Sequence, residues 1–368
     1  MNILLLTTHL NIGGIPRYVI NLAKSFASQG GHVFLASSKG FWQGELEEAE
    51  NIKLVFIPIN TKSILSLKVI KSFFVLSRFL KDNKVDIIHA NTRVTQFLAC
   101  LLYRVNRIPY VSTFHGCYRT HLFRRLFKCQ GLVSIAVSNF VKEHAVVKLG
   151  LKDEDIRVIH NGLDIKGRAN FRPQDEEVPR DKLKGYPIIG TVSRLTPEKN
   201  IRFLIEAMPL ILNKFPQACL VILGQGKEEG FLRKTVQELS LESKVIFLKK
   251  INPYSVYNSL DVFISLSTDE PFGFNVIEAQ ISEVPVIVSL SGALKEIVDD
   301  RINGLCLKDK APGSIIEALT FILENEESRK AMIVNARKKV ESCFSLERMA
   351  RDTLAVYKLA LEKDSLKP

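Results

Sequence analysis

The chain has 368 residues and a mass of 41.5 kDa, with 46% hydrophobic residues, 24% charged residues and a net charge of +12. This length and composition exclude a disordered protein and predict a globular protein, with two domains more probable than one. The two longest stretches without a charged residue, 1–16 and 129–141, are too short to cross a bilayer, and six scattered cysteines without a Cys-x-x-Cys pair favour a reducing cytoplasm.

The first residues form an apolar run with no basic segment ahead of it, and we expect a buried strand there rather than a signal peptide. Short β-type runs then alternate with helical runs. The expected strands are Ile3–Thr7, His32–Ala36, Val55–Ile57, Asp86–His89, Tyr110–Thr113, Val133–Val137 and Arg157–Ile159. The expected helices are Arg17–Ser28, Ser63–Lys81, Thr95–Val105 and Asn139–Leu149. Such alternation predicts a parallel, doubly wound sheet.

A polar stretch, 164–185, precedes a second half in which the alternation restarts. The expected strands there are Pro187–Val192, Cys219–Leu223, Lys244–Leu248, Val262–Leu266 and Val284–Val288, and the expected helices are Ile201–Asn213, Glu228–Ser240 and Asn275–Ile281. Residues 312–361 have an almost entirely helical pattern. We therefore predict an α/β protein with two Rossmann-like domains, 1–170 and 171–345, facing a cleft, and a C-terminal helix at about 346–368 that packs back on the first domain.

Positive charge is concentrated in the first half. Eight basic residues and no acid lie between positions 87 and 142, namely Arg93, Arg104, Arg107, Arg119, Arg124, Arg125, Lys128 and Lys142. The helix expected at 63–81 is basic and amphipathic. The candidate explanations are a solvated helix face, an anionic membrane surface or lipid-linked acceptor, and nucleic acid. Nucleic acid is the weakest, because no nucleic-acid-binding motif accompanies the charge.

The most informative motif is 267–278, where Glu270 and Glu278 stand eight positions apart across a Pro-Phe-Gly turn between an apolar strand and a helix. Backbone N–H groups and the positive end of the helix dipole at such a turn suit a phosphate. Glu270 would face a ligand from the loop, and Glu278 from one helical turn further on, about 5–6 Å away. The alternative is an exposed loop acid and an ordinary helical glutamate.

Two further motifs follow strands of the second half. Arg194 and Lys199 lie in a strand-to-helix loop and could clamp a diphosphate. Alternatively, Lys199 is a surface residue and Arg194 pairs with a carboxylate. Gly224 and Gly226 form a Gly-x-Gly strand end ahead of a helix, which is a weak signal alone.

The first half contributes two glycines and a histidine. Gly13 and Gly14 follow the first strand, and adjacent glycines let the backbone approach a phosphate or sugar closely, although their spacing is not a dinucleotide fingerprint. His115 stands at another strand end and is a candidate contact for a polar ligand. The acidic turn at 153–155 imitates a D-x-D metal motif, but a solvated turn is the simpler interpretation, so no metal site is predicted.

Taken together in this order, the motifs resemble the retaining glycosyltransferases of family 4, which have the two-Rossmann GT-B fold. The resemblance spans essentially the whole chain and rests most on the Glu-x7-Glu element with its Phe-Gly turn; the 160–164 run His-Asn-Gly-Leu-Asp also fits. Two positions depart from the family pattern: Glu283 stands where glycine is usual, and Ala293 replaces the second glycine of the next loop. Both bear on donor choice more than on the fold.

The resemblance implies a nucleoside-diphosphate sugar bound mainly to the second domain. Glu278 would accept hydrogen bonds from the ribose hydroxyls, and Glu270 would contact hydroxyls of the donor sugar. Arg194 and Lys199 would hold the diphosphate in place of a metal ion, so no cofactor is expected. The residues implied as catalytic are Glu270, His115, Arg194 and Lys199, and those implied as substrate-binding are Gly13, Gly14, Gly224, Phe272, Gly273, Phe274, Asn275 and Glu278.

The activity expected from the resemblance is transfer of a sugar from this donor to an acceptor. The basic amphipathic segments favour a lipid-linked or cell-envelope glycan as that acceptor, and hence a cytoplasmic enzyme peripheral to the inner face of the cell membrane. Two alternatives stay open at this point. One is a sugar-nucleotide epimerase on the same fold, which needs no acceptor, and the other is a non-catalytic protein that binds anionic surfaces.

Overall fold

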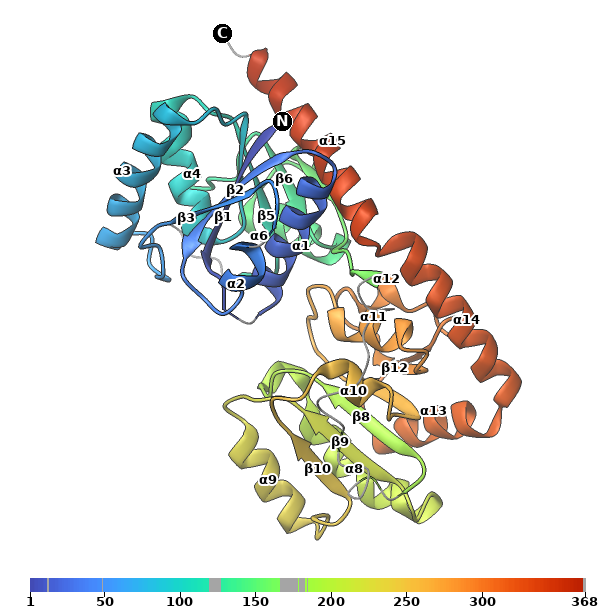
Figure 1. The fold of residues 1–368 in the computed structure, drawn as a ribbon. Coiled ribbons are helices and arrows are strands. Elements are labelled where there is room, and N and C mark those ends of the chain that lie inside the picture. The colour runs from blue at the N-terminus through green and yellow to red at the C-terminus, as the bar shows by residue number, and fades with distance from the viewer. Residues whose placement is uncertain are drawn as a thin grey trace. The chain divides into compact units, whose positions relative to one another are not determined.

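The computed structural model describes residues 1–11, 13–47, 49–118, 127–165, 178, 183 and 185–366. The chain divides into two compact units, the first formed by Met1–Asp164 with Ser345–Pro368 and the second by Ile165–Phe344. Each unit is a parallel β-sheet with helices on both faces (Figure 1). Most of the predicted polar linker, and the cations Arg119, Arg124 and Arg125, lie outside the described residues.

The first unit contains a seven-stranded sheet in the order β3-β2-β1-β4-β5-β6-β7, and every neighbouring pair is parallel. The strands are β1 (Asn2–His9), β2 (His32–Ser38), β3 (Ile52–Phe56), β4 (Ile87–Ala90), β5 (Tyr110–Phe114), β6 (Val133–Ala136) and β7 (Ile156–Val158). All seven predicted strands are present, with β3 displaced toward the N-terminus. The strand order reverses between β1 and β4, and the loops after these two strands diverge to opposite faces, as at the ligand crevice of other open α/β sheets.

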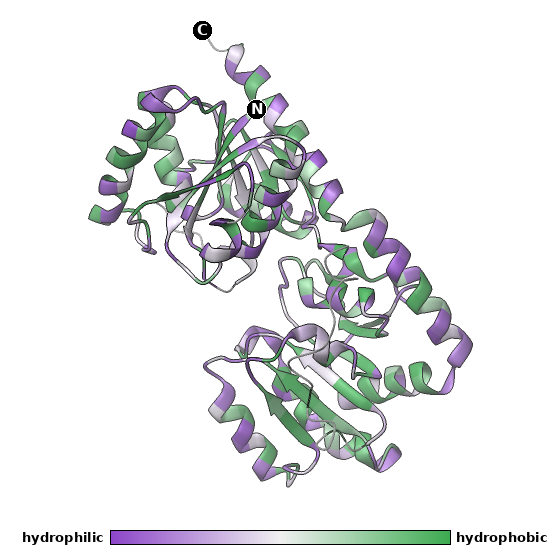
Figure 2. Ribbon diagram, in the orientation of Figure 1, coloured by the Kyte–Doolittle hydropathy of each residue, from purple (hydrophilic) through white to green (hydrophobic). Residues whose placement is uncertain are grey.

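Helices cover both faces of this sheet. They are α1 (Gly14–Ser28), α2 (Gln43–Glu47), α3 (Leu67–Asp82), α4 (Arg93–Asn106), α6 (Asn139–Leu149) and α15 (Leu346–Ser365), and a 3₁₀ turn, η1, spans Asp153–Asp155. Successive residues of β1 point to opposite faces. Ile3 and Leu5 pack with α1 and α15, whereas Leu4 and Leu6 pack with α3 and α4. Because both faces are buried, the central strands are rich in hydrophobic residues, as Figure 2 shows.

A buried polar network joins α15 to the sheet. The His89 ring bonds through Nδ1 to the Tyr357 hydroxyl at 2.7 Å and through Nε2 to Thr113 Oγ1 at 2.6 Å. Tyr18 lies 3.4 Å from the same Thr113 oxygen. Burial lowers the pKa of His89 to about 3, so the ring is neutral and offers one donor and one acceptor. The chain's last helix is therefore fixed to the first unit by specific bonds as well as by apolar packing.

The second unit contains a six-stranded parallel sheet in the order β10-β9-β8-β11-β12-β13. Its strands are β8 (Ile188–Val192), β9 (Cys219–Leu223), β10 (Val245–Leu248), β11 (Val262–Ser265), β12 (Val286–Ser289) and β13 (Leu305–Leu307). Of these six strands, only β13 was not predicted. The order reverses between β8 and β11, which places the second ligand-binding edge at the loops after these two strands.

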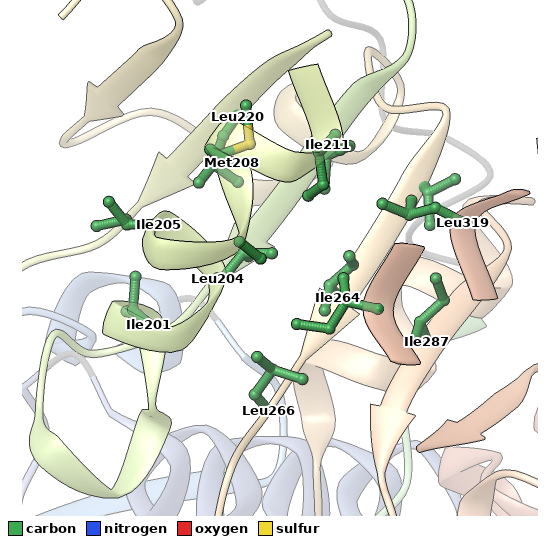
Figure 3. Packing of buried hydrophobic residues seen from close by; sticks show 14 of the residues in the cluster. Ile201, Leu204, Ile205, Met208, Ile211, Leu220, Ile264, Leu266, Ile287 and Leu319 are labelled. Atoms are coloured by element: carbon green, nitrogen blue, oxygen red, sulfur yellow. The ribbon is translucent and has the colours of Figure 1, made fainter. Parts of the chain in front are cut away.

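The helices of this unit are α8 (Ile201–Lys214), α9 (Glu229–Glu238), α10 (Pro253–Tyr257), α11 (Phe274–Ile281), α12 (Leu294–Ile297), α13 (Pro312–Glu324) and α14 (Glu326–Cys343), with a 3₁₀ turn, η2, at Pro197–Lys199. Figure 3 shows how α8 closes one face of the sheet. Its inward residues recur at helical spacing and meet strand and α13 residues in one core: Ile201, Leu204, Ile205, Met208, Ile211, Leu220, Ile264, Leu266, Ile287 and Leu319. This packing sets the position of the loop between β8 and α8.

Candidate active site

An ion pair joins the two central loops of the second unit. Lys199 ends η2, after β8, and Glu270 lies in the loop after β11; the lysine Nζ is 2.5 Å from the glutamate Oε2. Their side chains are only 13% and 10% exposed. Glu270 is therefore not the exposed loop acid of the alternative interpretation, nor is Lys199 a free surface residue. Two residues predicted from separate motifs are in direct contact.

Three hydrogen bonds, two of them from the Asn200 side chain, hold the same two loops together. Asn200 adopts a left-handed conformation (φ 54°), and its amide donates to Leu266 O at 2.8 Å and to Thr268 Oγ1 at 2.6 Å. The Thr268 N–H in turn donates to Glu198 O at 2.8 Å. These three bonds fix the register between the loops. The Lys199–Glu270 pair is therefore part of a preorganised loop pair.

A third loop, after β12, supports Glu270 from behind. The Ala293 N–H donates to Glu270 O at 2.8 Å. Gly292 has a φ of 59°, and a Cβ atom there would lie 2.5 Å from Glu270 O. Only glycine lets the two backbones come this close. The sequence departure at Ala293 leaves this contact intact, because the contact uses backbone atoms.

Arg194 is exposed, unlike Lys199, the residue with which it was predicted to hold a diphosphate. Its side chain is 78% exposed, and its guanidinium lies 3.9 Å from the Glu198 carboxylate. The loop thus presents one cation inside the loop pair and one in solvent. Arg194 therefore pairs with a carboxylate, as its alternative interpretation held, and its contact with a diphosphate stays a prediction.

The turn after Glu270 starts α11 with unused donors. Gly273 adopts a φ of 109°, which favours glycine, and no side chain caps the helix. The first turn of α11 carries no acid. Asn275 is held by a 2.9 Å bond from its amide to Val192 O, at the end of β8. The backbone N–H groups of Phe274 and Asn275 therefore begin a helix whose dipole favours an anion.

Glu278 lies one turn into α11, as predicted. Its Oε2 accepts a 3.1 Å bond from the Tyr257 hydroxyl, which fixes the carboxylate's direction. Nothing in the spacing of the sequence indicated Tyr257. Phe272, by contrast, was predicted to bind substrate, yet its ring is buried against Phe274 and Phe344 at centroid distances of 5.1 and 5.8 Å. The Phe272 side chain therefore packs the turn, and a substrate contact at this residue stays a prediction.

The Gly-x-Gly pair after β9 also has a packing explanation. A Cβ at Gly224 would lie 1.9 Å from Ser193 O, and one at Gly226 would lie 2.1 Å from Leu195 O. These glycines let the loop after β9 approach the loop after β8. In the structure they position the Arg194 loop, which accounts for both residues without a ligand.

The two predicted glycines of the first unit, unlike Gly224 and Gly226, are not packed against neighbouring backbone among the described residues. Gly13 and Gly14 are exposed and form the start of α1 with no side-chain cap. A Cβ at Gly14 would meet no atom within 4 Å, and one at Gly13 would meet only Pro16 Cδ, at an ordinary 3.6 Å. The packing of their own unit does not require glycine at either position. That a ligand at the carboxyl end of β1 lies against both glycines stays a prediction.

His115 follows β5 and contacts Asn91, which follows β4. The Asn91 amide nitrogen faces two carbonyls, Leu6 O at 3.4 Å and His89 O at 3.3 Å, so its oxygen is the atom that faces His115 Nε2 at 3.2 Å. His115 must then carry its proton on Nε2, which leaves Nδ1 as an acceptor. Burial lowers the pKa of His115 to about 3, so the imidazole is neutral at physiological pH. Asn91 was not predicted as a site residue, although its position directly after β4, where ligands bind in such sheets, is a signal in the sequence.

The acidic turn η1 is neutralised by lysines. Asp153 lies 2.9 Å from Lys142 Nζ, and Asp155 lies 2.6 Å from Lys363 Nζ. The middle acid, Glu154, lies 3.5 Å from Lys152 Nζ. Within the described residues, these acids serve as ion-pair partners.

Two protein-family models match the chain, one described as Glycosyltransferase Family 4 over residues 12–166 and one as Glycosyl transferases group 1 over residues 174–339. An uncharacterized glycosyltransferase of Methanocaldococcus jannaschii is 30% identical over 386 residues, which cover 95% of each chain. A UDP-Gal:alpha-D-GlcNAc-diphosphoundecaprenol alpha-1,3-galactosyltransferase of Escherichia coli is 26% identical, with 81% of each chain covered.

Among solved structures, HepE of Anabaena in complex with UDP and glucose has a TM-score of 0.82 and 20% identity, covering 98% of this chain and 100% of that one. At this identity the likeness establishes the fold. The GT-B fold predicted from the sequence is confirmed.

The two kinds of glycine give opposite outcomes when replaced by alanine. Gly224→Ala forces a Cβ against Ser193 O and is expected to lower the free energy of unfolding by about 1–3 kcal/mol. Gly14→Ala fills open space, so its free energy of unfolding should stay within about 0.5 kcal/mol of the parent while substrate turnover falls at least about tenfold. Urea unfolding followed by circular dichroism, with turnover assays, measures both. Equal loss of stability in both variants, or unchanged turnover in Gly14→Ala, would contradict this assignment.

Proposed function

The chain belongs to the family 4 glycosyltransferases, and from this premise we propose that it moves a sugar, with retention of anomeric configuration, from a nucleoside-diphosphate sugar to a lipid-linked or other cell-envelope glycan. The observation that carries the proposal is the Lys199–Glu270 pair, which is buried at the carboxyl ends of β8 and β11 beside an uncapped helix. A cation, a carboxylate and free N–H groups together suit a phosphorylated sugar.

The donor's charges and hydroxyls match groups on three loops. The diphosphate accepts hydrogen bonds from Lys199 and from the N–H groups of Phe274 and Asn275, and Arg194 folds in from solvent. Glu270 and Glu278 accept hydrogen bonds from hydroxyls of the sugar and the ribose, respectively. The Tyr257 hydroxyl keeps Glu278 aimed at the ribose, which explains why a buried tyrosine ends beside a helix carboxylate. Protein cations take the place of a metal ion in this scheme.

The reaction breaks the bond between the anomeric carbon and the β-phosphate oxygen, and the bonding electrons leave with the phosphate. The acceptor oxygen bonds to the same face of the oxocarbenium-like carbon, and its proton passes to the departing phosphate. Positive groups fixed where this charge grows are each worth ~10²–10³ in rate. Neutral His115 contributes its Nδ1 lone pair to a sugar hydroxyl. No protein nucleophile is part of the mechanism.

A lipid-linked acceptor is supported by the surface of α3 in the first unit. Within the described residues, no helix is long and apolar enough to span a membrane. On α3, however, Leu67, Ile70 and Phe74 are exposed at the i, i+3, i+7 spacing of one face, opposite the buried residues Val69 and Leu76. Of the 20 exposed large hydrophobic residues that the structure describes, five fall within residues 65–75. This is a concentration that solvent alone does not explain.

Cations share that face. Lys71, Arg78 and Lys81 are exposed among the apolar residues, and the one acid of the helix, Asp82, is at its end. Apolar side chains can enter a bilayer while lysine and arginine reach its anionic headgroups. A second copy of the chain is a poorer occupant, because a two-fold interface would bring like charges together. We therefore propose that α3 lies on an anionic membrane surface, which makes the enzyme peripheral to the membrane on its cytoplasmic side.

Sugar transfer is tested with a panel of nucleotide sugars, ranked by thermal shift because a ligand at 100 times its Kd adds ~2.7 kcal/mol of stability. With the best donor and lipid-linked or free glycan acceptors, the glycosidic product should keep the donor's anomeric configuration by NMR. Glu270→Gln should lower the rate by ~10²–10³, whereas the control Glu206→Gln, whose carboxylate is paired with Arg202 on α8, should not. An epimerised nucleotide sugar formed without acceptor, or an inverted product, would sink the proposal.

Membrane docking is tested with the matched variants Phe74→Glu and Val147→Glu. Both residues belong to the first unit, and their exposures are nearly equal, 67% on α3 and 66% on α6. Phe74→Glu should weaken binding to phosphatidylglycerol-containing vesicles at least about tenfold, and Val147→Glu should not. Parent binding should fall with salt and vanish on phosphatidylcholine vesicles. Equal effects of the two variants, or salt-independent binding, would rule out this surface.

A further inference from the structure

An exposed aromatic and cationic surface lies at the carboxyl ends of β1, β2 and β3 in the first unit. Phe41 is 68% exposed and contacts the ring of Trp42 edge-on, at a centroid distance of 5.0 Å and an interplanar angle of 89°. The Arg17 guanidinium, from the first turn of α1, lies 5.2 Å from the Trp42 ring centroid. The Lys39 ammonium lies 5.6 Å from the ring of Phe56, which ends β3. We call these five residues the aromatic platform.

The backbone holds the platform in place. Gly40 lies against the loop after β1, where a Cβ would be 2.4 Å from the carbonyl carbon of Leu10. The Trp42 N–H donates to Leu10 O at 3.0 Å, and the half-buried Trp42 ring packs against the unit's core. With Trp42 directed inward, the adjacent Phe41 is directed outward. The exposure of Phe41 therefore follows from how the loop is anchored.

The two cations of the platform have no carboxylate partner within ion-pair distance among the described residues, which leave out positions 12 and 48 nearby. A similar stack in the second unit differs on this point. There Arg202 lies over Phe231 at 5.4 Å, but its guanidinium also pairs with Glu206 at 2.6 Å. The start of α1 adds uncapped N–H groups beside Arg17. The platform thus presents positive charge next to open aromatic faces.

We propose that the aromatic platform is the acceptor subsite and that it binds a saccharide carrying an acidic group, either a phosphate or a carboxylate. This inference rests on the proposed function and names the acceptor's chemistry. The C–H face of a sugar ring packs on an aromatic side chain, and Arg17 and Lys39 supply charged hydrogen bonds to the acidic group. Arg17, in the first turn of α1, lies four residues after Gly13, and its backbone N–H donates to Gly13 O at 3.1 Å. An acceptor held there is adjacent to the ligand-binding edge of β1.

The chain offers a direct probe, because Trp42 is its one tryptophan. Its fluorescence is titrated in the full-length protein with glucose 1-phosphate, glucuronate, glucose and inorganic phosphate. We expect a saturable change with one of the two acidic sugars and at least about tenfold weaker binding of glucose and of phosphate. Glucose 1-phosphate and glucuronate distinguish a phosphorylated acceptor from a uronic one.

Three variants locate the binding. Phe41→Ala should weaken the acidic sugar about fivefold, and Arg17→Gln and Lys39→Gln about tenfold each. The matched controls Phe231→Ala and Arg202→Gln should leave it unchanged. No fluorescence response to either acidic sugar, an equally tight response to inorganic phosphate alone, or loss in the control variants would overturn the subsite.

The experiment separates this inference from the proposed function. Fluorescence needs no turnover, so the platform can be overturned while sugar transfer stands. Where transfer is measured, Phe41→Ala should raise the acceptor KM and leave the donor KM unchanged. An unchanged acceptor KM with an intact donor KM would remove the platform from the acceptor site and leave the glycosyltransferase activity untouched.

Discussion

The contact between Lys199 and Glu270 is the constraint on which the second unit's site depends. Two largely buried charges cost free energy unless each neutralises the other, so the ion pair favours the arrangement in which the loops after β8 and β11 stay together. Asn200 and Gly292 enforce this arrangement from both sides. A diphosphate that contacts Lys199 leaves Glu270 in need of new partners, and sugar hydroxyls are suitable donors. The free protein thus already holds a cation and a carboxylate side by side, and these are the groups that a charged sugar requires.

The two sheets put this polarity where a ligand can use it. In each unit the strand order reverses at a pair of neighbouring strands, β1 and β4 in the first and β8 and β11 in the second. The loops that follow such a pair run to opposite faces of the sheet, which makes a place for a ligand at the carboxyl ends of the strands. Glycines have two distinct uses at these edges. Gly224 and Gly292 allow backbones to touch, which builds the site, whereas a Cβ at Gly14 would meet no atom of the described residues within 4 Å. The first kind of glycine is explained by packing, and for the second a ligand contact is our proposal.

The sequence was enough to predict the alternating strands, the restart after the linker and the Glu-x7-Glu turn, because these features repeat locally or span few residues. It could not predict that Lys199 and Glu270 touch, since 71 positions separate them. Tyr257 was missed for the same reason, and the packing of the Phe272 ring could not be predicted because a motif does not show which way a ring points. The platform at Phe41 and Trp42 carries no spacing signal; only the fold brings Arg17 to it.

A double-mutant cycle on the transfer reaction tests the central claim most directly. Lys199→Met and Glu270→Gln would each be compared with the parent and with the double variant by kcat/KM for the donor. If the pair acts as one unit, each single variant loses ~10²–10³ and the double variant loses about as much as the worse single one. Losses that multiply in the double variant, or a Lys199→Met enzyme as active as the parent, would contradict the account.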